Sequence, residues 1–321
     1  MPKYVLTGCD GNLGSIAASY ALTLAGPDDE LIFTSHKPDS IDRALVRDWT
    51  SKGAQLVQLD YGDPEASLAR VFAGAAAVSF ISTWLIGEGR RAQHANVIAA
   101  AKAAGVRRIC YTSFVGAELR ETVDKEEDMP FLPRDHAFTE ALIRQSGLQY
   151  NIQRNYLYMD NVPQFFAQSF AFCGDRWLCN SAGAKGAFVA REDCGRVLGA
   201  LLMGRGEPNQ VYAVTGPEPV TYREVFEWMA AQTGYAGEFV EMEDGELERW
   251  WRERGLPYDV YGDFSKLPCK LCMYDLLCCG QMVAWGHMKE TTDAVEKLTG
   301  RKPLSFREAL LKYKDIFPKP Q

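Results

Sequence analysis

The first half of the chain alternates short apolar runs with longer amphipathic stretches. The apolar runs, which are typical of strands, cover residues 3–8, 30–35, 54–60, 76–82, 107–113 and 148–154. The stretches with helical periodicity cover residues 12–25, 42–51, 64–72, 91–104 and 133–145. Gly26-Pro27, Gly105 and Gly147 provide helix stop signals. Strands that alternate with helices of this length predict an α/β fold: a Rossmann-type, doubly wound parallel sheet with helices on both faces.

The alternation weakens after Arg154, and residues 155–173 are rich in Tyr and Phe. Further helices are expected at residues 191–203, 221–232, 243–254, 271–283, 291–298 and 305–313, and strands at 210–214 and 237–242. We predict a dinucleotide-binding domain at residues 1–154 and a smaller, helix-rich lobe at residues 155–321, some segments of which return to the sheet. Because ligands of such folds bind beyond the carboxyl ends of the strands, the substrate is expected between the two lobes.

Composition and charge narrow the class of protein. The 321 residues can bury a large core without a disulfide or metal. A net charge of −7 disfavours nucleic-acid binding. Uncharged stretches such as residues 71–87 are too short and too polar to span a membrane, and the first residues are typical of a strand rather than a signal peptide. We expect a cytoplasmic protein, and a homodimer is left open.

The nine cysteines are odd in number and irregularly spaced, as in proteins without a disulfide framework. Cys269, Cys272, Cys278 and Cys279 form one cluster, in which the first two have the spacing of a zinc knuckle. No second pair follows at a suitable distance, and adjacent cysteines suit chelation poorly. We therefore predict buried thiols on a helix and no metal site.

The strongest motif is the glycine loop Gly8-x-x-Gly11-x-x-Gly14, which follows a predicted strand and opens a predicted helix. Glycines there permit a tight turn and a close backbone approach to phosphate, while the helix N-terminus offers free N–H groups. Asp10, Asn12 and Leu13 belong to the same loop. The context predicts dinucleotide binding.

The end of the second strand indicates which dinucleotide binds. NAD-binding proteins place a carboxylate there, whereas this chain has Ser35, His36 and Lys37, which favour the 2′-phosphate of NADP(H). The alternative is that Lys37 is an ordinary solvated residue. Further contacts are expected at the ends of the third, fourth and fifth strands: Asp60 and Tyr61; Ile81, Ser82 and Thr83; Thr112 and Ser113.

The catalytic pair of ordinary short-chain dehydrogenases is missing. Those enzymes use Ser with Tyr-x-x-x-Lys, and none of the 14 tyrosines here has Lys four residues later. Ser113 fills the serine position, and His136 with Glu140 stands where the Tyr and Lys are expected. At i, i+4 spacing, Glu140 is expected to orient His136 and raise its pKa. The alternative is a surface ion pair of little energetic weight.

Together these residues resemble the NmrA-like, atypical short-chain dehydrogenase family, in particular its quinone-oxidoreductase and triphenylmethane-reductase branch. The resemblance is carried by the glycine loop, Gln93-His94-x-Asn96, Tyr111-Thr-Ser113, His136-x-x-x-Glu140, Arg154-Asn155-x-x-Tyr158 and Ala190-Arg191-Glu192-Asp193. The chain departs from the family at Cys9-Asp10, and its Trp- and Cys-rich residues 250–285 have no counterpart that we can align.

The resemblance implies an NADP-binding domain in which Ser113, His136 and Asn155 flank the nicotinamide. It also implies an aromatic wall around the substrate, made by Phe114, Tyr156, Tyr158, Met159, Phe165 and Phe166. For the phenylalanines, ordinary core packing is an equal alternative.

Three functions fit the sequence. The first is an NADPH-dependent reductase of a conjugated or aromatic small molecule, such as a quinone, quinone methide, imine or enone, with natural-product tailoring in secondary metabolism as a special case. The second is a redox sensor that binds NADP without turnover and reports to a protein partner. The third is a redox-neutral isomerase, dehydratase or cyclase with His136 as acid–base. Oxidation of NADPH separates the first from the others.

Overall fold

The computed structural model describes residues 1–268 and 271–320. Its centre is a parallel sheet with the strand order β3-β2-β1-β4-β5-β6-β9. The strands are β1 (Lys3–Thr7), β2 (Glu30–Ser35), β3 (Gln55–Gln58), β4 (Ala75–Phe80), β5 (Arg108–Phe114), β6 (Gln149–Asn155) and β9 (Gln210–Val214). All of these pairs are parallel, which confirms the predicted doubly wound fold.

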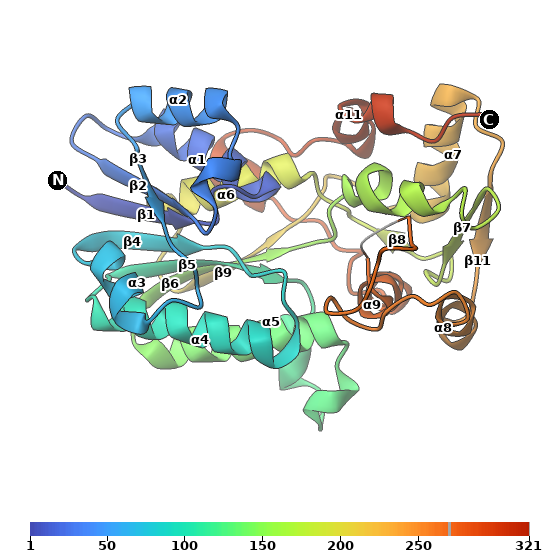
Figure 1. Ribbon diagram of the computed structural model, residues 1–321, viewed down its shortest axis with the longest axis horizontal. Coiled ribbons are helices and arrows are strands. Elements are labelled where there is room, and N and C mark those ends of the chain that lie inside the picture. Colours follow the sequence, from blue (N-terminus) through green and yellow to red (C-terminus); the bar gives the residue numbers. More distant parts are fainter. Residues whose placement is uncertain (269–270, 321) are drawn as a thin grey trace.

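Helices cover both faces of this sheet (Figure 1). On one face lie α1 (Asn12–Leu24), α2 (Arg43–Ser51) and α6 (Arg191–Leu202), and on the other α3 (Glu65–Phe72), α4 (Gly87–Ala103) and α5 (Phe131–Ser146). The side chains of each strand alternate between two buried clusters: Val5 and Ile32 face one, Leu6 and Phe33 the other. The alternating runs of the sequence thus become a sheet that is apolar on both sides.

Two segments from the second half of the chain pack onto the sheet. Strand β9 pairs with β6, and α6 packs on α1. That helix contact is close because α6 carries glycines: a Cβ on Gly195 would lie 2.7 Å from the side chain of Ile16, and one on Gly199 would lie 2.7 Å from the carbonyl oxygen of Ala17. Any larger residue would push the two helices apart.

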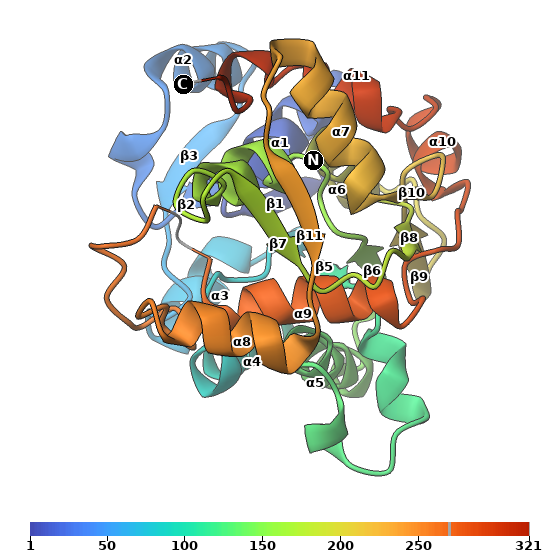
Figure 2. The same ribbon diagram turned by 90° about the vertical axis from the view of Figure 1, so that its right-hand side faces the viewer.

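Most of the second half of the chain forms the smaller lobe, seen end-on in Figure 2. Its strands are β7 (Arg176–Cys179), β8 (Lys185–Gly186), β10 (Val220–Thr221) and β11 (Glu238–Glu241), and its helices are α7 (Tyr222–Thr233), α8 (Asp244–Arg252), α9 (Met273–Ala284), α10 (Ala294–Thr299) and α11 (Phe306–Leu311). Short helical turns are η1 (Pro38–Ser40), η2 (Ala117–Glu121), η3 (Glu126–Asp128), η4 (Val162–Phe166), η5 (Ala167–Ser169) and η6 (Lys314–Ile316). Strand β7 pairs with β11 and β8 with β10.

Helix α9 lies between the lobe and α5 (Figure 2). A Cβ on Gly280 would overlap the side-chain oxygen of Asn180, so only glycine allows this close contact. Cys278 and Cys279 of α9 are buried, as predicted, and Cys272 is buried directly before it; Cys269 lies outside the described residues. Within the described ranges, no group of His, Cys, Asp and Glu is placed to hold a metal ion, and no helix is long and apolar enough to cross a membrane.

Candidate functional site

The glycine loop has the geometry of a phosphate site. Gly8 adopts φ +68°, a left-handed conformation that favours glycine. A Cβ on Gly14 would lie 2.0 Å from the carbonyl oxygen of Gly8, so the start of α1 can lie against the turn only because Gly14 has no side chain. No described side chain caps α1, which leaves its first N–H groups available to an anion.

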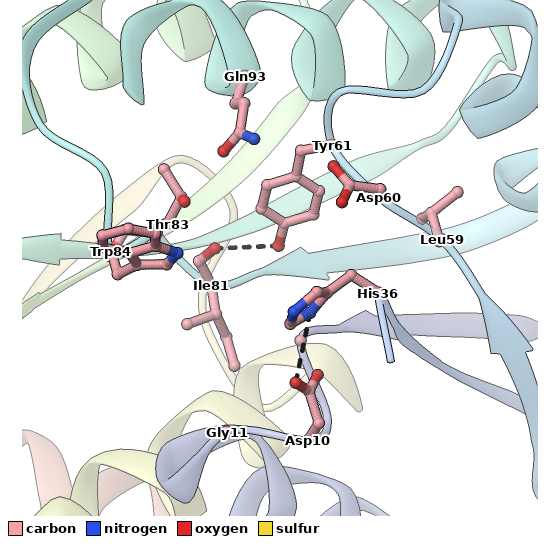
Figure 3. A pocket seen from close by; sticks show the side chains of 12 residues that line it. Asp10, Gly11, His36, Leu59, Asp60, Tyr61, Ile81, Thr83, Trp84 and Gln93 are labelled. Atoms are coloured by element: carbon pink, nitrogen blue, oxygen red, sulfur yellow. Dashed lines mark hydrogen bonds and ion pairs between the residues drawn. The ribbon is translucent and has the colours of Figure 1, made fainter. Parts of the chain in front are cut away.

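Above this loop lies a cavity of about 240 Å³ at the carboxyl ends of the strands (Figure 3). It brings together many of the predicted cofactor residues: Gly8, Asp10, Gly11, His36, Asp60, Tyr61, Ile81, Ser82 and Thr83. The sequence prediction missed three further lining residues, Leu59, Trp84 and Gln93. Two of them are direct neighbours of predicted residues, and adjacency in sequence is the signal that could have found them. We call this cavity the cofactor cleft.

Two of these newly found residues fit a bound ligand. The side-chain oxygen of Gln93 is buried without a hydrogen-bond partner in the described structure, so it can accept a hydrogen bond from a ligand. The Trp84 indole is 68% exposed and lies across the cleft from Leu59 and Asp60 (Figure 3). An exposed indole at the mouth of a cleft offers a flat face to a planar ring. The site therefore fits a dinucleotide.

The residues predicted for the 2′-phosphate are only partly in the cleft. His36 lines it, and its Nδ1 lies 3.4 Å from a carboxylate oxygen of Asp10. Lys37 is exposed just outside, and the buried Ser35 hydroxyl accepts a hydrogen bond from the backbone N–H of Lys37 at 2.9 Å. Asp60 accepts a hydrogen bond from the backbone N–H of Gly62 at 2.7 Å, which fixes its carboxylate at the rim. Phosphate binding by Ser35 and Lys37 stays a prediction.

The floor of the cleft is held by hydrogen bonds between strand ends. The Tyr61 hydroxyl contacts the Thr7 hydroxyl and donates to the carbonyl oxygen of Ile81 at 3.0 Å, so it joins β1 to β4. Burial raises the pKa of Tyr61, which keeps it a neutral donor. Thr112, expected to bind the cofactor, instead accepts a hydrogen bond from the backbone N–H of Ser82 at 2.8 Å and is itself buried. Thr112 therefore positions the segment that lines the cleft.

His94 fixes the next residue of that segment. Its Nε2 accepts a hydrogen bond from the backbone N–H of Thr83 at 3.1 Å, so Nδ1 carries the proton and donates to the Thr139 hydroxyl at 2.9 Å. Burial, and then the positive charge of Arg90, lower the pKa of His94, which keeps it neutral. The sequence analysis quoted His94 as part of a motif but assigned it no role.

The predicted pair of His136 and Glu140 is wrong. Glu140 accepts hydrogen bonds from the Ser113 hydroxyl at 2.6 Å, from Arg154 at 2.7 and 2.8 Å and from Arg144 at 3.0 Å. Ser113 and Arg154 are register partners on β5 and β6, so both side chains project toward α5, where Glu140 meets them. The buried Glu140 carboxylate already accepts hydrogen bonds from Arg154, Arg144 and Ser113, so it is not free to orient His136.

His136 has a different partner. Its Nδ1 lies 2.7 Å from the Tyr111 hydroxyl, and both residues are buried. Burial, the positive charge of Arg90 and the proximity of His94 lower the pKa of His136 well below its usual value, whereas the sequence analysis expected a raised pKa. His136 is therefore a neutral imidazole that shares a hydrogen bond with a neutral phenol.

The aromatic wall predicted around the substrate is largely core. Phe166 stacks on Trp177 with ring centroids 5.6 Å apart, which favours the core-packing alternative for this phenylalanine, and Met159 is 1% exposed; a substrate contact by either residue stays a prediction. The Tyr158 hydroxyl accepts a hydrogen bond from the Asn155 side chain at 2.8 Å, and the Arg191 guanidinium lies over its ring. Substrate contacts by Phe114, Tyr156, Tyr158 and Phe165, and cofactor contacts by Asn12, Leu13 and Asn155, stay predictions.

A second cavity, of about 510 Å³, lies between the sheet domain and the small lobe. It is lined from the sheet domain by Ile86, Gly87, Glu127, Met129, Phe131 and Arg134, and from the lobe by Asp259, Tyr261, Tyr274, Leu277, Cys278 and Gln281. We call it the interlobe cavity. A substrate site between the lobes was expected from the sequence, but none of these lining residues was named, and residues 250–285, which have no family counterpart that we can align, supply the lobe side.

Comparison with known proteins supports the interpretation of the cofactor cleft. Residues 8–164 match a family model described as NAD(P)H-binding. Over 220 residues, the chain is 30% identical to the (4-alkanoyl-5-oxo-2,5-dihydrofuran-3-yl)methyl phosphate reductase of Streptomyces griseus, covering 68% of this chain and 70% of that protein. The chain belongs to the NmrA-like family of NAD(P)H-binding oxidoreductases. Membership in this family confirms the predicted resemblance and makes the chain an NAD(P)H-dependent reductase.

Two other family members are similar over most of their length. Quinone oxidoreductase 2 of Escherichia coli is 27% identical over 78% of this chain and 82% of its own. An NmrA-like family domain-containing oxidoreductase of Aspergillus flavus is 27% identical over 72% of both chains. Solved structures share the fold: the E. coli quinone oxidoreductase with NADPH has a TM-score of 0.75 at 24% identity over 96% of this chain and 99% of its own. The Citrobacter triphenylmethane reductase with NADP(H) has a TM-score of 0.74 at 22% identity over 97% and 99%.

Proposed function

We propose that the chain is an NADPH-dependent reductase that transfers hydride to a flat, conjugated small molecule held in the interlobe cavity. The observation that carries this proposal is the adjacency of the two cavities. Trp84 lines the cofactor cleft, and Ile86 and Gly87, two and three residues later, line the interlobe cavity. A cofactor in the first and an acceptor in the second would therefore meet across one short segment.

The residues around the reaction site favour acceptors that take up hydride easily. A bound reduced nicotinamide supplies the hydride. His136 and Tyr111 are neutral and buried, and their shared hydrogen bond leaves no strong acid of the Tyr–Lys type. An acceptor in which the developing negative charge delocalises, such as a quinone, quinone methide, imine or enone, needs only positioning and a weak proton donor.

The relatives support a conjugated acceptor. Their names describe reduction of a quinone, of a triphenylmethane and of an unsaturated furanone, all of which are conjugated. The lobe side of the interlobe cavity is built from residues 250–285, so we expect an acceptor of unusual shape, with an aromatic natural product as the most specific candidate.

NADPH is the proposed cofactor form. Lys37 beside the cleft offers a cation to a 2′-phosphate, and His36 in the cleft offers an imidazole N–H donor. Asp10 lies 3.4 Å from Nδ1 of His36, so it helps to orient the imidazole.

The test is NADPH oxidation with a panel of naphthoquinones, enones and imines, measured under anaerobic conditions by loss of absorbance of the reduced nicotinamide. The proposal expects acceptor-dependent oxidation, faster with NADPH than with NADH. Tight NADPH binding without oxidation by any acceptor would instead support the redox-sensor hypothesis. Conversion of an acceptor without net NADPH oxidation would support the redox-neutral one.

A further inference from the structure

The interlobe cavity combines aromatic side chains with an arginine that forms no ion pair within the part of the chain that the structure describes. We propose that this cavity binds a planar acceptor that carries an anionic group, with Arg134 as the partner of that group. The inference rests on the proposed function, because it assigns the substrate class of the same site.

The aromatic lining suits a flat ligand. Phe131, in the first turn of α5, and Tyr274, in α9, approach each other with ring centroids 5.5 Å apart at 38°. Tyr261 is 60% exposed and Tyr274 is 42% exposed, although both are large apolar rings. The two exposed tyrosines of the small lobe and the half-buried Phe131 of the sheet domain converge on one cavity, as in a typical ligand-binding surface.

The guanidinium of Arg134 lacks a hydrogen-bond acceptor among the described residues. The Nε of Arg134 is buried and has no hydrogen-bond partner, and the guanidinium forms no ion pair with any described residue. Arg91, one helix away, differs: it lies 3.1 Å from Asp135 and also binds Glu126. A half-buried guanidinium without a partner is favourably completed by a carboxylate, sulfonate or phosphate, which match its geometry.

The surroundings strengthen the positive potential at this place. The first turn of α5 contains no acidic residue and no described side chain caps it, so the positive end of the helix dipole adds to the charge of Arg134. Nearby Arg90 is buried, and its Nη1 lies 3.9 Å from a carboxylate oxygen of Asp135, so its charge is balanced within the protein.

The two carboxylates in the lining leave Arg134 free. Glu127 is exposed to water at the rim, where its charge is screened. Asp259 is held by its own loop, since its side chain accepts a hydrogen bond from the backbone N–H of Tyr261 at 3.0 Å. Among the described residues neither acid forms an ion pair with Arg134, so the guanidinium is available to an anionic ligand group.

Arg134 lies close to the place where hydride transfer is proposed to occur. A Cβ on Gly116, just past the end of β5, would lie 3.2 Å from the ring of Pro133, so the first turn of α5 sits on the carboxyl end of β5. In doubly wound folds the reactive end of a bound dinucleotide lies at such strand ends. An acceptor anchored at Arg134 is thus held beside the place where hydride transfer is proposed to occur.

The test uses two matched probes, anthraquinone-2-sulfonate and the neutral 2-(hydroxymethyl)anthraquinone. Binding is measured by calorimetry with the enzyme saturated with NADP⁺, so that no turnover takes place. Arg134→Gln is expected to weaken sulfonate binding about tenfold or more and to change binding of the neutral probe by less than about twofold. Arg134→Lys, which keeps the charge, is expected to retain most of the affinity for the sulfonate.

Arg47→Gln is the matched control. Arg47 is exposed on α2, on the opposite face of the sheet, so this change removes the same charge without touching the interlobe cavity. Equal losses for both probes, or no loss for the sulfonate, would overturn the inference even if quinones oxidise NADPH. Conversely, Arg134-dependent sulfonate binding without NADPH oxidation by any acceptor would sustain the anion site and overturn the proposed reductase function.

Discussion

The cofactor cleft and the interlobe cavity are built in different ways. The cleft is made by backbone turns at the ends of neighbouring strands, and its lining comes from short segments such as residues 8–11, 59–61 and 81–84. The interlobe cavity is made by side chains from residues 86 to 281, which meet only because α9 docks between the lobe and α5. The cleft is fixed by backbone geometry that a whole family can share, whereas the cavity can change its chemistry by single substitutions.

The largest expected effect comes from the buried charge that lies between the two regions. Glu140→Ala removes the partner of Arg154, Arg144 and Ser113. We expect a loss of about 3 kcal/mol in the free energy of unfolding, because the buried Ser113 hydroxyl and the largely buried Arg154 lose their acceptor, although Arg154 keeps its ion pair with Glu118. Urea denaturation measures it. A loss below about 1 kcal/mol, the size of a surface pair, would show that the cluster is solvated.

The second-largest effect is expected from a substitution that distorts the cofactor cleft and leaves the interlobe cavity unchanged. Gly14→Ala places a Cβ about where the carbonyl oxygen of Gly8 lies. We expect a fall of about 1–3 kcal/mol in stability from the forced backbone shift and a loss of NADPH affinity of about a hundredfold. Gly245→Ala in α8 is the control, since a Cβ at that position would meet nothing within 4 Å. Unchanged NADPH affinity in Gly14→Ala would contradict the assigned role of the loop.

Cofactor selectivity provides a third test, at the rim of the cleft. Lys37→Asp is expected to weaken NADPH binding about tenfold more than NADH binding, because a carboxylate repels the 2′-phosphate. Calorimetric titration with both cofactors measures this ratio. Equal losses for the two cofactors would remove Lys37 from the phosphate site.

The buried histidine gives a pH-dependent prediction. The folded-state pKa of His136 is lowered, so the unfolded state binds more protons once the pH falls below the ordinary histidine value. Its contribution to stability is fully present above pH ~6.5 and is lost as the pH falls, by up to about 1.4 kcal/mol per pH unit. Comparing His136→Asn with the unmodified chain between pH 7.5 and 5.5 isolates this contribution.

Other groups titrate in that range, and Asp193, whose pKa burial raises to about 6, acts in the opposite direction. The difference between the two proteins cancels them. A stability difference that does not vary with pH would mean that His136 titrates normally in the folded state.

The smallest effect concerns Trp84. Because its exposed indole lines the cleft, NADPH should quench its fluorescence, and Trp84→Phe should remove most of that signal while raising the dissociation constant about threefold. Trp285→Phe is the control, since Trp285 is 52% exposed and lies outside the cleft lining. If the signal instead disappears in Trp285→Phe, the cofactor reaches the small lobe.

The fold could be predicted because, in the first half of the chain, apolar residues recur with a period of about two residues in the strands and about 3.6 residues in the helices. The strands β8 and β10 were missed because two residues are too few to show a period, and β7 was missed because three consecutive buried residues, Trp177–Cys179, show no alternation. Helices α4 and α5 begin earlier than expected, since Gly87, Gly89 and Pro133 disguise their first turns.

In the candidate site, too, the residues of local sequence motifs could be predicted, whereas those that meet only through the tertiary structure could not. The glycine loop is a local backbone motif, so its residues were found from spacing alone. The partner of Glu140 depends on strand register: Ser113 opposes Arg154 across β5 and β6, and helix spacing gives no information about this. The interlobe cavity depends on contacts between residues nearly two hundred positions apart, which no local pattern encodes.

The central claim is direct hydride transfer from a cofactor in the cleft to a carbon of an acceptor in the interlobe cavity. The most direct test is a single turnover with NADPH that carries deuterium at C4 of the nicotinamide, in the position from which hydride is transferred. The acceptor is a cyclic enone or a triarylmethane dye, and the product is analysed by mass spectrometry. The account predicts one deuterium on the reduced carbon, lost in Gly14→Ala and retained in Gly245→Ala. A product that gains no deuterium, or an acceptor that returns unchanged from a complex that binds NADPH, would contradict it.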